Sequence, residues 1–462
     1  MVSVVFAYDT EEYQAPFTDD ATKIWADMLT KHGLKGCFCI VGEKARVLRD
    51  RGRRDIIDSL KEHEIDYHSD LHSVHPTHAE YLNELNWDDG VRRCLAEETP
   101  GIADVENIMG QRPTAHCKPG SSWGPQVTYG MSILGLPVFA DAPVEYAPGQ
   151  PMWFCNQLCL KYHTSFERSM NVENRFKHMK DGFLERYESW SEGYLVMMSH
   201  PCLMLAKTFG DGLNFRDGKN TPREQWKPVP KRPKADAEAI QEAADRFLEF
   251  VAGEGIPVVT YREIYEKYKE ENVWISLETA LDIMRSVSGE LTYHRANGMF
   301  LSPAEIFGIA AFILDGYNQS RTLPTTLPIR RPIGPTEDCV SDAPIQVNLD
   351  VFLNVASQAH QKVSFAHRVP SIIDLVGQQV TPGDFLKAAA NLIGDLHAQS
   401  QPPKTVMIEL AQNTPTLAER EDFKKMRIGG WLMAPGFEAH NVVAMAKRQT
   451  WTAKPAVPSN QR

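Results

Sequence analysis

Histidines and carboxylates occur in this chain at spacings that would let them share a metal ion. The segment HSDLHSVHP, residues 68–76, contains three histidines and an aspartate. His68 and His72 are four positions apart, a spacing that puts both imidazoles on one face if the segment begins a helix. Two histidines and one carboxylate leave coordination positions open for water and substrate, which is typical of a catalytic zinc-type site.

The carboxylate for such a site is expected near the N-terminus. Asp9 and Glu11 follow the apolar run VSVVFAY and are separated by one residue. This spacing allows one carboxylate to bind a metal while the other acts as a base. His200 ends a second apolar run, GYLVMMSH.

Two further polar positions follow short apolar runs and are expected to contact a substrate. Lys118 and Asp141 are the charged residues at these positions. The Gly/Ser-rich segment after Lys118 includes Pro119, Gly120 and Trp123, whose ring is expected to form a pocket wall.

The elements that would position these residues alternate between strands and helices. Strands are predicted at 2–8, 35–41, 63–67, 114–118, 136–141, 193–199 and 256–261, and helices at 19–33, 53–63 and 236–255. This rhythm predicts an α/β fold with a mostly parallel sheet, either open or closed into a barrel. The carboxyl ends of parallel strands meet at one face, so the candidate residues are expected to converge there.

The composition changes after residue 270. The region that follows is rich in helices, and residues 300–324 align with residues 379–403. Both stretches read as a Ser/Thr-Pro helix start, an acidic first turn, an apolar helix and a proline-bearing segment. We therefore expect a catalytic domain over 1–270, helical repeats over 271–345 and 346–448, and a disordered tail over 449–462.

Bulk properties exclude several classes of protein. The chain has 462 residues, 42% hydrophobic residues and a net charge of −11, which argues against nucleic acid or an anionic membrane as the main partner. No apolar stretch approaches the length of a membrane span, and the first residues do not form a secretory signal. These observations favour a cytoplasmic protein with free thiols, while cell-wall association stays open.

The N-terminal region resembles the polysaccharide deacetylases of the NodB-homology type, the fourth carbohydrate esterase family. The matching segments, in order, are FAYDTEE, HEIDYHSDLHSVHP, AHCKPGSSWG, LVMMSHP and FLEFVAGEGIPVVTYREI. The second is similar to the family's His-Ser/Thr-x-x-His motif at His68, Ser69 and His72. The resemblance covers about the first 270 residues.

The resemblance implies a distorted (β/α)7 barrel and a set of roles. It makes Asp9 the general base and His200 the general acid, with Glu11, His68 and His72 on one divalent ion. That ion would be Zn²⁺ first, with Co²⁺, Mn²⁺ or Ni²⁺ as alternatives. The family mostly removes acetyl groups from N-acetyl sugar units of glycans or peptidoglycan, while one cytoplasmic branch hydrolyses small cyclic amides or ureides.

The sequence departs from the family pattern at two positions. Glu11 stands where an aspartate is usual, after one inserted residue, so either Glu11 reaches further to the ion or Asp9 itself binds it. Lys118 is the nearest basic residue to the place of the arginine that normally steadies the catalytic aspartate, and lysine cannot form the bidentate contact of a guanidinium. The orientation of Asp9 is therefore the open question.

The C-terminal repeats have a weaker resemblance of their own. Residues 290–415 resemble pseudomurein-binding-type repeats, in which a proline-marked segment precedes an apolar helix. This resemblance implies glycan binding, and the alternative is an accessory region that packs or forms a homo-oligomer.

Two other functions remain to be separated from a deacetylase. His68 and Asp70 form a His-x-Asp pair that, with His200, matches the ligands of a non-haem iron oxygenase, a reading that also requires an antiparallel jelly roll. Alternatively, a catalytically weak barrel binds glycans without hydrolysing them.

Overall fold

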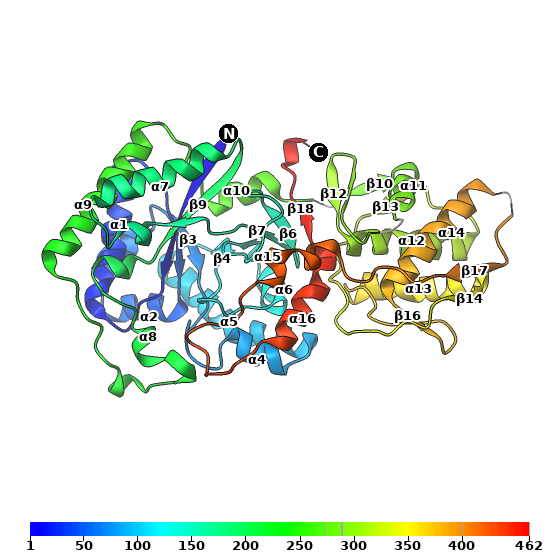
Figure 1. Cartoon of the computed structure of the whole chain (residues 1–462), viewed down its shortest axis with the longest axis horizontal. Helices are drawn as coiled ribbons and strands as arrows, with labels where there is room; N and C mark the ends of the chain where they lie inside the picture. The colour runs from blue at the N-terminus through cyan, green and yellow to red at the C-terminus, as the bar shows by residue number, and fades with distance from the viewer. Residues whose placement is uncertain (272, 288–289, 400, 462) are drawn as a thin grey trace. The chain divides into compact units, whose positions relative to one another are not determined.

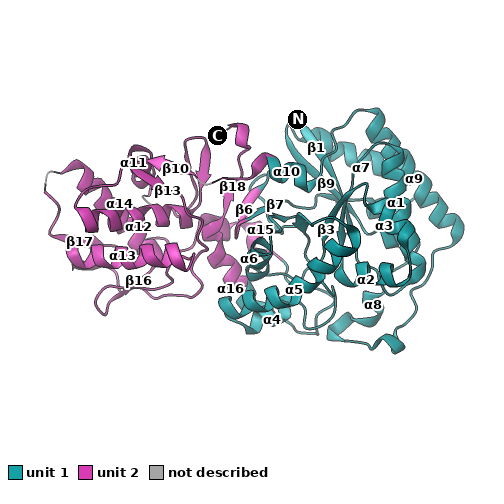
Figure 2. Cartoon of the chain, turned by 180° about the vertical axis from the view of Figure 1, so that it is seen from behind, with its two compact units in different colours: residues 1–151, 157–266, 427–442 teal, residues 152–156, 267–426, 443–462 magenta. Residues whose placement is uncertain are grey.

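The computed structural model describes residues 1–271, 273–287, 290–399 and 401–461 (Figure 1). The chain divides into two compact units (Figure 2). Unit 1 comprises Met1–Pro151, Gln157–Glu266 and Arg427–Val442, and unit 2 comprises Met152–Asn156, Lys267–Met426 and Val443–Arg462. The first boundary lies close to the expected one at 270, whereas the return of residues 427–442 to unit 1 differs from the expected second repeat.

Unit 1 alternates strands with helices, as the sequence predicted. Its strands are β1 (Val2–Thr10), β2 (Cys37–Ile40), β3 (Glu64–Tyr67), β4 (Ala115–His116), β5 (Val138–Phe139), β7 (Gln157–Cys159), β8 (Thr164–Ser165) and β9 (Gly193–Ser199). Its helices are α1 (Asp19–Lys31), α2 (Gly42–Asp50), α3 (Arg54–Leu60), α4 (His78–Glu84), α5 (Trp87–Met109), α6 (Pro125–Ile133), α7 (Arg175–Ser189), α8 (Asp211–Asn214) and α9 (Lys234–Gly253), and α10 (Tyr261–Tyr268) follows.

The sheet of unit 1 is mainly parallel. Its strands follow the order β7-β5-β4-β3-β2-β1-β9-β8 and form a curled half-barrel, consistent with the predicted distorted barrel. The α/β prediction is confirmed. The strand expected at 256–261 makes only an isolated parallel bridge, Val4 to Val258.

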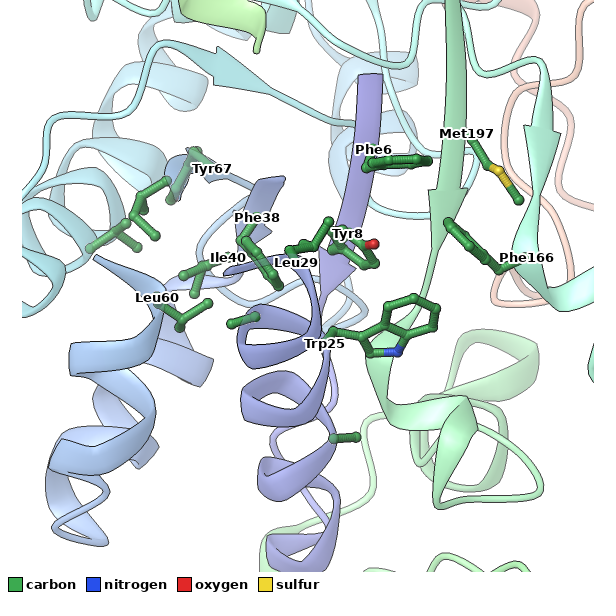
Figure 3. Close-up of a cluster of buried hydrophobic side chains, with 14 of the residues drawn as sticks. Phe6, Tyr8, Trp25, Leu29, Phe38, Ile40, Leu60, Tyr67, Phe166 and Met197 are labelled. Carbon is green, nitrogen blue, oxygen red and sulfur yellow. The ribbon is translucent and has the colours of Figure 1, made fainter. Parts of the chain in front are cut away.

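Alternation along the strands divides apolar from polar side chains. Phe6 and Tyr8 of β1 lie in the hydrophobic cluster that α1 covers, and Tyr8 lies 5.1 Å from Trp25 between ring centroids (Figure 3). The neighbouring residue Asp9 pairs in register with Cys39 of β2, which in turn pairs with Asp66 of β3. Because successive side chains alternate between faces, Asp9 lies on the face opposite the helices.

Unit 2 contains a structural duplication. The order β10 (Trp274–Ser276), α11 (Leu277–Ser286), β11 (His294–Ala296), β12 (Met299–Leu301), α12 (Pro303–Ser320), β13 (Thr326–Pro328) is repeated by β14 (Ile345–Asn348), α13 (Leu349–Phe365), β15 (Ile373–Asp374), β16 (Gln379–Val380), α14 (Pro382–Ala398), β17 (Thr405–Ile408). In each copy the first strand pairs antiparallel with the last, and the two middle strands form an antiparallel pair. Both copies contribute to one hydrophobic cluster.

The end of the chain differs from the expected disordered tail. After α15 (Glu421–Lys424) and α16 (His440–Gln449), β18 (Lys454–Pro455) pairs antiparallel with β6 (Met152–Phe154). Trp451 is buried in the cluster of unit 2, and Lys454 forms ion pairs with Glu270 and Glu305. The apolar and charged contacts of these residues give the tail a fixed place despite its polar composition.

Within the described residues, no helix combines the length and apolar character that crossing a bilayer requires.

Candidate metal and catalytic site

The candidate residues lie at the carboxyl ends of parallel strands, as predicted. Asp9 is near the end of β1, and Glu11 follows the strand directly. His68 comes directly after β3, and His200 directly after β9. Because β1 pairs in parallel with β2 and β9, and β2 with β3, these ends share one edge of the sheet.

Glu11, His68 and His72 meet in a buried cluster. Glu11 Oε2 lies 2.9 Å from His72 Nε2 and 3.3 Å from His68 Nε2. The two imidazole centroids are 4.8 Å apart. All three residues are buried, and one ligand atom from each lies within 4.8 Å of the others.

The other ring nitrogens of both histidines are already engaged. His68 Nδ1 donates to the Cys117 carbonyl at 3.2 Å, and His72 Nδ1 donates to Asp211 Oδ2 at 2.7 Å. These bonds orient both Nε2 atoms toward Glu11 Oε2 and so toward one candidate metal position. His72 Nε2 is buried without a hydrogen bond of good geometry, although Glu11 Oε2 lies 2.9 Å away, as expected for ligands that converge on one ion. The donor set therefore fits Zn²⁺.

The histidine pair is not on a helix, contrary to the expectation from its spacing. Helix α4 begins only at His78, and the preceding segment is a turn-rich loop. Ser69 and His72 have φ angles of 61° and 55°, in the left-handed region that residues other than glycine seldom adopt. The loop is held by the Ser69 hydroxyl, which accepts from His72 N at 3.2 Å, and by Glu98, which accepts from Asp70 N at 3.0 Å.

Electrostatic attraction between carboxylates and imidazoles shifts the pKa values of the groups in this cluster. Burial disfavours the charge of Glu11, but His72 and His200 outweigh it and hold the pKa of this carboxyl well below its usual range. Burial likewise opposes protonation of His72, yet Glu11 and Asp211 raise its pKa to about 9. The acidic and basic groups of the cluster therefore favour each other's charged forms.

Asp9 and His200 lie beside the metal cluster and face each other. His200 Nε2 is 3.9 Å from Asp9 Oδ2 and 3.7 Å from Glu11 Oε2. Burial opposes protonation of His200, but the carboxylates of Glu11 and Glu167 raise its pKa to about 10. These carboxylates therefore favour the protonated imidazole, which is the form that a general acid needs before it reacts.

Tyr162 and Glu167 orient these two groups. The Tyr162 hydroxyl donates to Asp9 Oδ1 at 2.8 Å, and His200 Nδ1 donates to Glu167 Oε1 at 2.5 Å. Tyr162 thus orients Asp9 through Oδ1, and no hydrogen bond to Asp9 Oδ2 is found within the described residues.

The predicted substrate-binding residues are divided by the structure. Lys118 donates to the Asp141 carbonyl at 2.8 Å and forms an ion pair with the Asp141 carboxylate. Lys118 therefore binds Asp141, and the residue that orients Asp9 is Tyr162. Gly120 is exposed, whereas Pro119 and Trp123 are buried, so the Trp123 ring has no surface to offer as a pocket wall.

Three residues of the site carry no signal in the local sequence. Tyr162, Glu167 and Asp211 are far in sequence from the groups that they contact, and each lies outside the motifs quoted above. Asp211 follows a glycine in TFGDG, a loop composition that marks a turn without indicating its partner.

The iron-oxygenase reading is wrong on both of its requirements. Asp70 Oδ1 accepts from Arg46 Nη1 at 2.7 Å and does not join the ligand cluster of the described residues. The fold is α/β with a mainly parallel sheet and not a jelly roll.

Comparison with known proteins finds similarity only among solved structures. No family model and no curated protein matches the chain. A family 4 carbohydrate esterase from Streptomyces lividans is 13% identical, with 56% of this chain and 92% of that chain covered and a TM-score of 0.32. A peptidoglycan deacetylase from Bacillus subtilis is 14% identical, with 57% and 90% covered and a TM-score of 0.31.

A pseudoenzyme of the same esterase family, from Bacillus anthracis, is 13% identical, with 56% of this chain and 64% of that chain covered and a TM-score of 0.32. These solved structures are what part of this chain is similar to, and at 13–14% identity and TM-scores of 0.31–0.32 they do not assign the chain to their family. Because active and inactive proteins both occur among them, they do not show an activity for this chain.

Proposed function

We propose that the protein is a metal-dependent hydrolase of carbon–nitrogen bonds that removes acetyl groups from N-acetyl sugar units of a glycan or peptidoglycan. The observation that supports the proposal is the buried cluster of Glu11, His68 and His72, with Asp9 and His200 directly beside it. This arrangement supplies three ligands, a base and an acid within one site.

Glu11, His68 and His72 would hold the ion, most simply Zn²⁺. When bound, such an ion polarises the amide carbonyl and lowers the pKa of water toward about 7. Side chains of the protein accept and donate the protons. Asp9 Oδ2 accepts the proton of the attacking water, because Oδ1 is held by Tyr162. His200 Nε2 then donates its proton to the leaving amine.

The proposal is tested with zinc-loaded and chelator-treated full-length protein. The substrates are N-acetylglucosamine oligomers, scored by released acetate, and small cyclic amides, scored by ring opening. We expect zinc-dependent acetate release from the oligomers. Ring opening without acetate release would instead support the cyclic-amide hydrolase, and binding without turnover would support the catalytically weak glycan-binding protein.

Variants separate the metal ligands from the base. His68→Ala and His72→Ala should lose both bound zinc and activity. Asp9→Asn should keep zinc and lose about 10²- to 10⁴-fold in kcat, the usual contribution of a general base. His440→Ala is the matched control, because His440 is exposed and lies outside the site. Retention of activity by His72→Ala would contradict the proposal.

A further inference from the structure

Residues 427–442 belong to unit 1 although unit 2 supplies the chain on both sides of them. We call them the returning segment. Ala439 and Val442 are buried in the main cluster of unit 1, and Leu432 is buried with Tyr13 and Phe215. The returning segment is therefore an integral part of the catalytic unit, and it lies outside the N-terminal region that carries the deacetylase-like motifs.

The returning segment joins two loops that flank the candidate site. Gly429 N donates to the Ser121 carbonyl at 2.8 Å, in the loop that follows β4. Gly218 N donates to the Leu432 carbonyl at 2.7 Å, in the loop that contains α8. A Cβ atom added to Gly120 would lie 3.7 Å from Leu432 Cδ1, so Leu432 also lies near the first loop.

Trp431 is a large apolar side chain of this segment that is exposed. Its neighbours Leu432 and Met433 are buried, whereas Trp431 is 44% exposed. The indole lies against Gly212, where a Cβ atom would be 3.6 Å from the ring. Gly212 adjoins Asp211, the carboxylate that orients His72. The ring is thus placed beside the loop that supports the metal ligands.

An exposed cation lies beside Trp431, and a second exposed apolar side chain lies next to His72 in the sequence. The Arg216 guanidinium lies 5.1 Å from the centroid of the Trp431 ring and is itself exposed. Leu71, between the two metal-binding histidines, is 41% exposed. A single exposed apolar side chain needs no explanation. Here Leu71 directly precedes His72, and Trp431 lies against the residue that follows Asp211, the partner of His72. The Trp431 ring also stacks with a cation.

A sugar ring has the chemistry that matches this surface. The flat indole can cover the apolar C–H face of a pyranose, and a guanidinium donates hydrogen bonds to hydroxyl and acetamido oxygens. A small acetylated molecule that only fills the metal site would not extend to Trp431. The surface therefore favours a substrate longer than one sugar unit.

We propose that Trp431, with Arg216 beside it, binds a sugar unit adjacent to the one that is deacetylated and so selects oligomeric glycans over small acetylated compounds. This inference rests on the proposed function for its substrate class. It means that a residue of the C-terminal part of the chain determines substrate specificity.

The test compares Trp431→Ala with wild type in zinc-loaded, full-length protein. For an N-acetylglucosamine tetramer we expect KM and the Kd from calorimetry to rise about fivefold or more, with kcat within about twofold. Hydrolysis of para-nitrophenyl acetate should not change. Trp431→Phe should recover most of the affinity, and Trp274→Ala is the matched control, because Trp274 is 62% exposed and lies in unit 2.

The outcomes distinguish this inference from the proposed function. Equal tetramer affinity in wild type and Trp431→Ala, or no binding of the tetramer to wild type, would overturn the role of Trp431. An equal loss on tetramer and ester would also overturn it. If wild type binds the tetramer through Trp431 but releases no acetate, the proposed hydrolase fails and the glycan site stands.

Discussion

At the scale of residues, the site depends on hydrogen bonds that orient the groups expected to react. The sequence left the partner of Asp9 open, and in the structure the Tyr162 hydroxyl donates to Asp9 Oδ1 at 2.8 Å. His200 is held by Glu167 and His72 by Asp211. Asp9, His72 and His200 are thus each oriented by a hydrogen bond to one atom of the side chain.

Replacing Tyr162 tests whether orientation of Asp9 matters. Tyr162→Phe removes one hydrogen bond to a carboxylate, a loss worth roughly 1.5–3 kcal/mol, so kcat should fall about tenfold or more. Bound zinc and KM should stay close to wild type, because the metal ligands are untouched. Tyr187→Phe, on α7, is the control. Steady-state kinetics with metal analysis checks this, and an unchanged kcat would show that Asp9 needs no such partner.

The buried His116 gives unit 1 an acid-sensitive stability. Burial, reinforced by His78, lowers the pKa of His116 to about 3, and Gln157 Nε2 lies 3.1 Å from His116 Nδ1. The unfolded chain takes up a proton near the ordinary value of 6.5, whereas the folded chain does not. Stability from this group is therefore complete above pH 6.5 and is lost progressively as the pH falls toward 3.

At pH 5 the expected loss from His116 is about 2 kcal/mol relative to pH 7. Urea unfolding of wild type and His116→Phe at both pH values measures it. The phenyl ring can keep the stacked contact with Phe139, whose centroid lies 4.7 Å away. The variant should lose less stability than wild type between pH 7 and 5, and parallel losses would exclude His116 as the source.

At the scale of elements, the two copies in unit 2 begin their main helices in the same way. The Ser302 hydroxyl accepts from Glu305 N at the start of α12, and the Thr381 hydroxyl accepts from Asp384 N at the start of α14. In both helices the acidic side chain accepts in return from the N-cap backbone, and proline follows the cap. The Ser/Thr-Pro-x-acid pattern in the sequence is therefore a capping box in each copy.

Removing either cap should destabilise unit 2 by a similar amount. Ser302→Ala and Thr381→Ala should each lower the free energy of unfolding by about 1 kcal/mol, because a buried helix N–H loses its acceptor. Ser320→Ala, at the exposed end of α12, should change it by less than about 0.5 kcal/mol. Chemical denaturation followed by circular dichroism measures the free energy of unfolding of all three variants. An unchanged value for Thr381→Ala would show that the second capping box does not stabilise unit 2.

At the scale of the whole molecule, distant parts of the sequence complete each unit. Residues 427–442 return to unit 1, and the last strand, β18, joins β6 in unit 2. Trp451 is 1% exposed and donates through Nε1 to the Asn413 carbonyl at 2.9 Å. The end of the chain is therefore part of the core of unit 2.

Trp451→Ala tests this role of the C-terminal residues. Truncating a buried tryptophan leaves a cavity and an unpaired carbonyl, so unit 2 should lose about 3–5 kcal/mol of stability. Trp274→Ala should have little effect, because that side chain is 62% exposed. Differential scanning calorimetry measures the stability of each variant. Equal losses of stability in the two variants would contradict a structural role for Trp451 and would support a disordered tail.

The sequence by itself determined the α/β class of unit 1, its strand order along the chain and the polar residues at the strand ends. These features follow from periodicity and from the convergence of parallel strands, both of which are readable within short windows. The repeat in unit 2 was also readable, because each copy keeps the same helix start.

Only the tertiary structure decided which side chains meet. His68 and His72 converge through a loop with two left-handed residues, and no helix is involved. Tyr162, Glu167 and Asp211 act across long sequence separations, and Trp431 is carried to unit 1 by the returning segment. Such contacts arise when separate elements pack together, and they cannot be predicted from the secondary-structure propensities of short sequence windows.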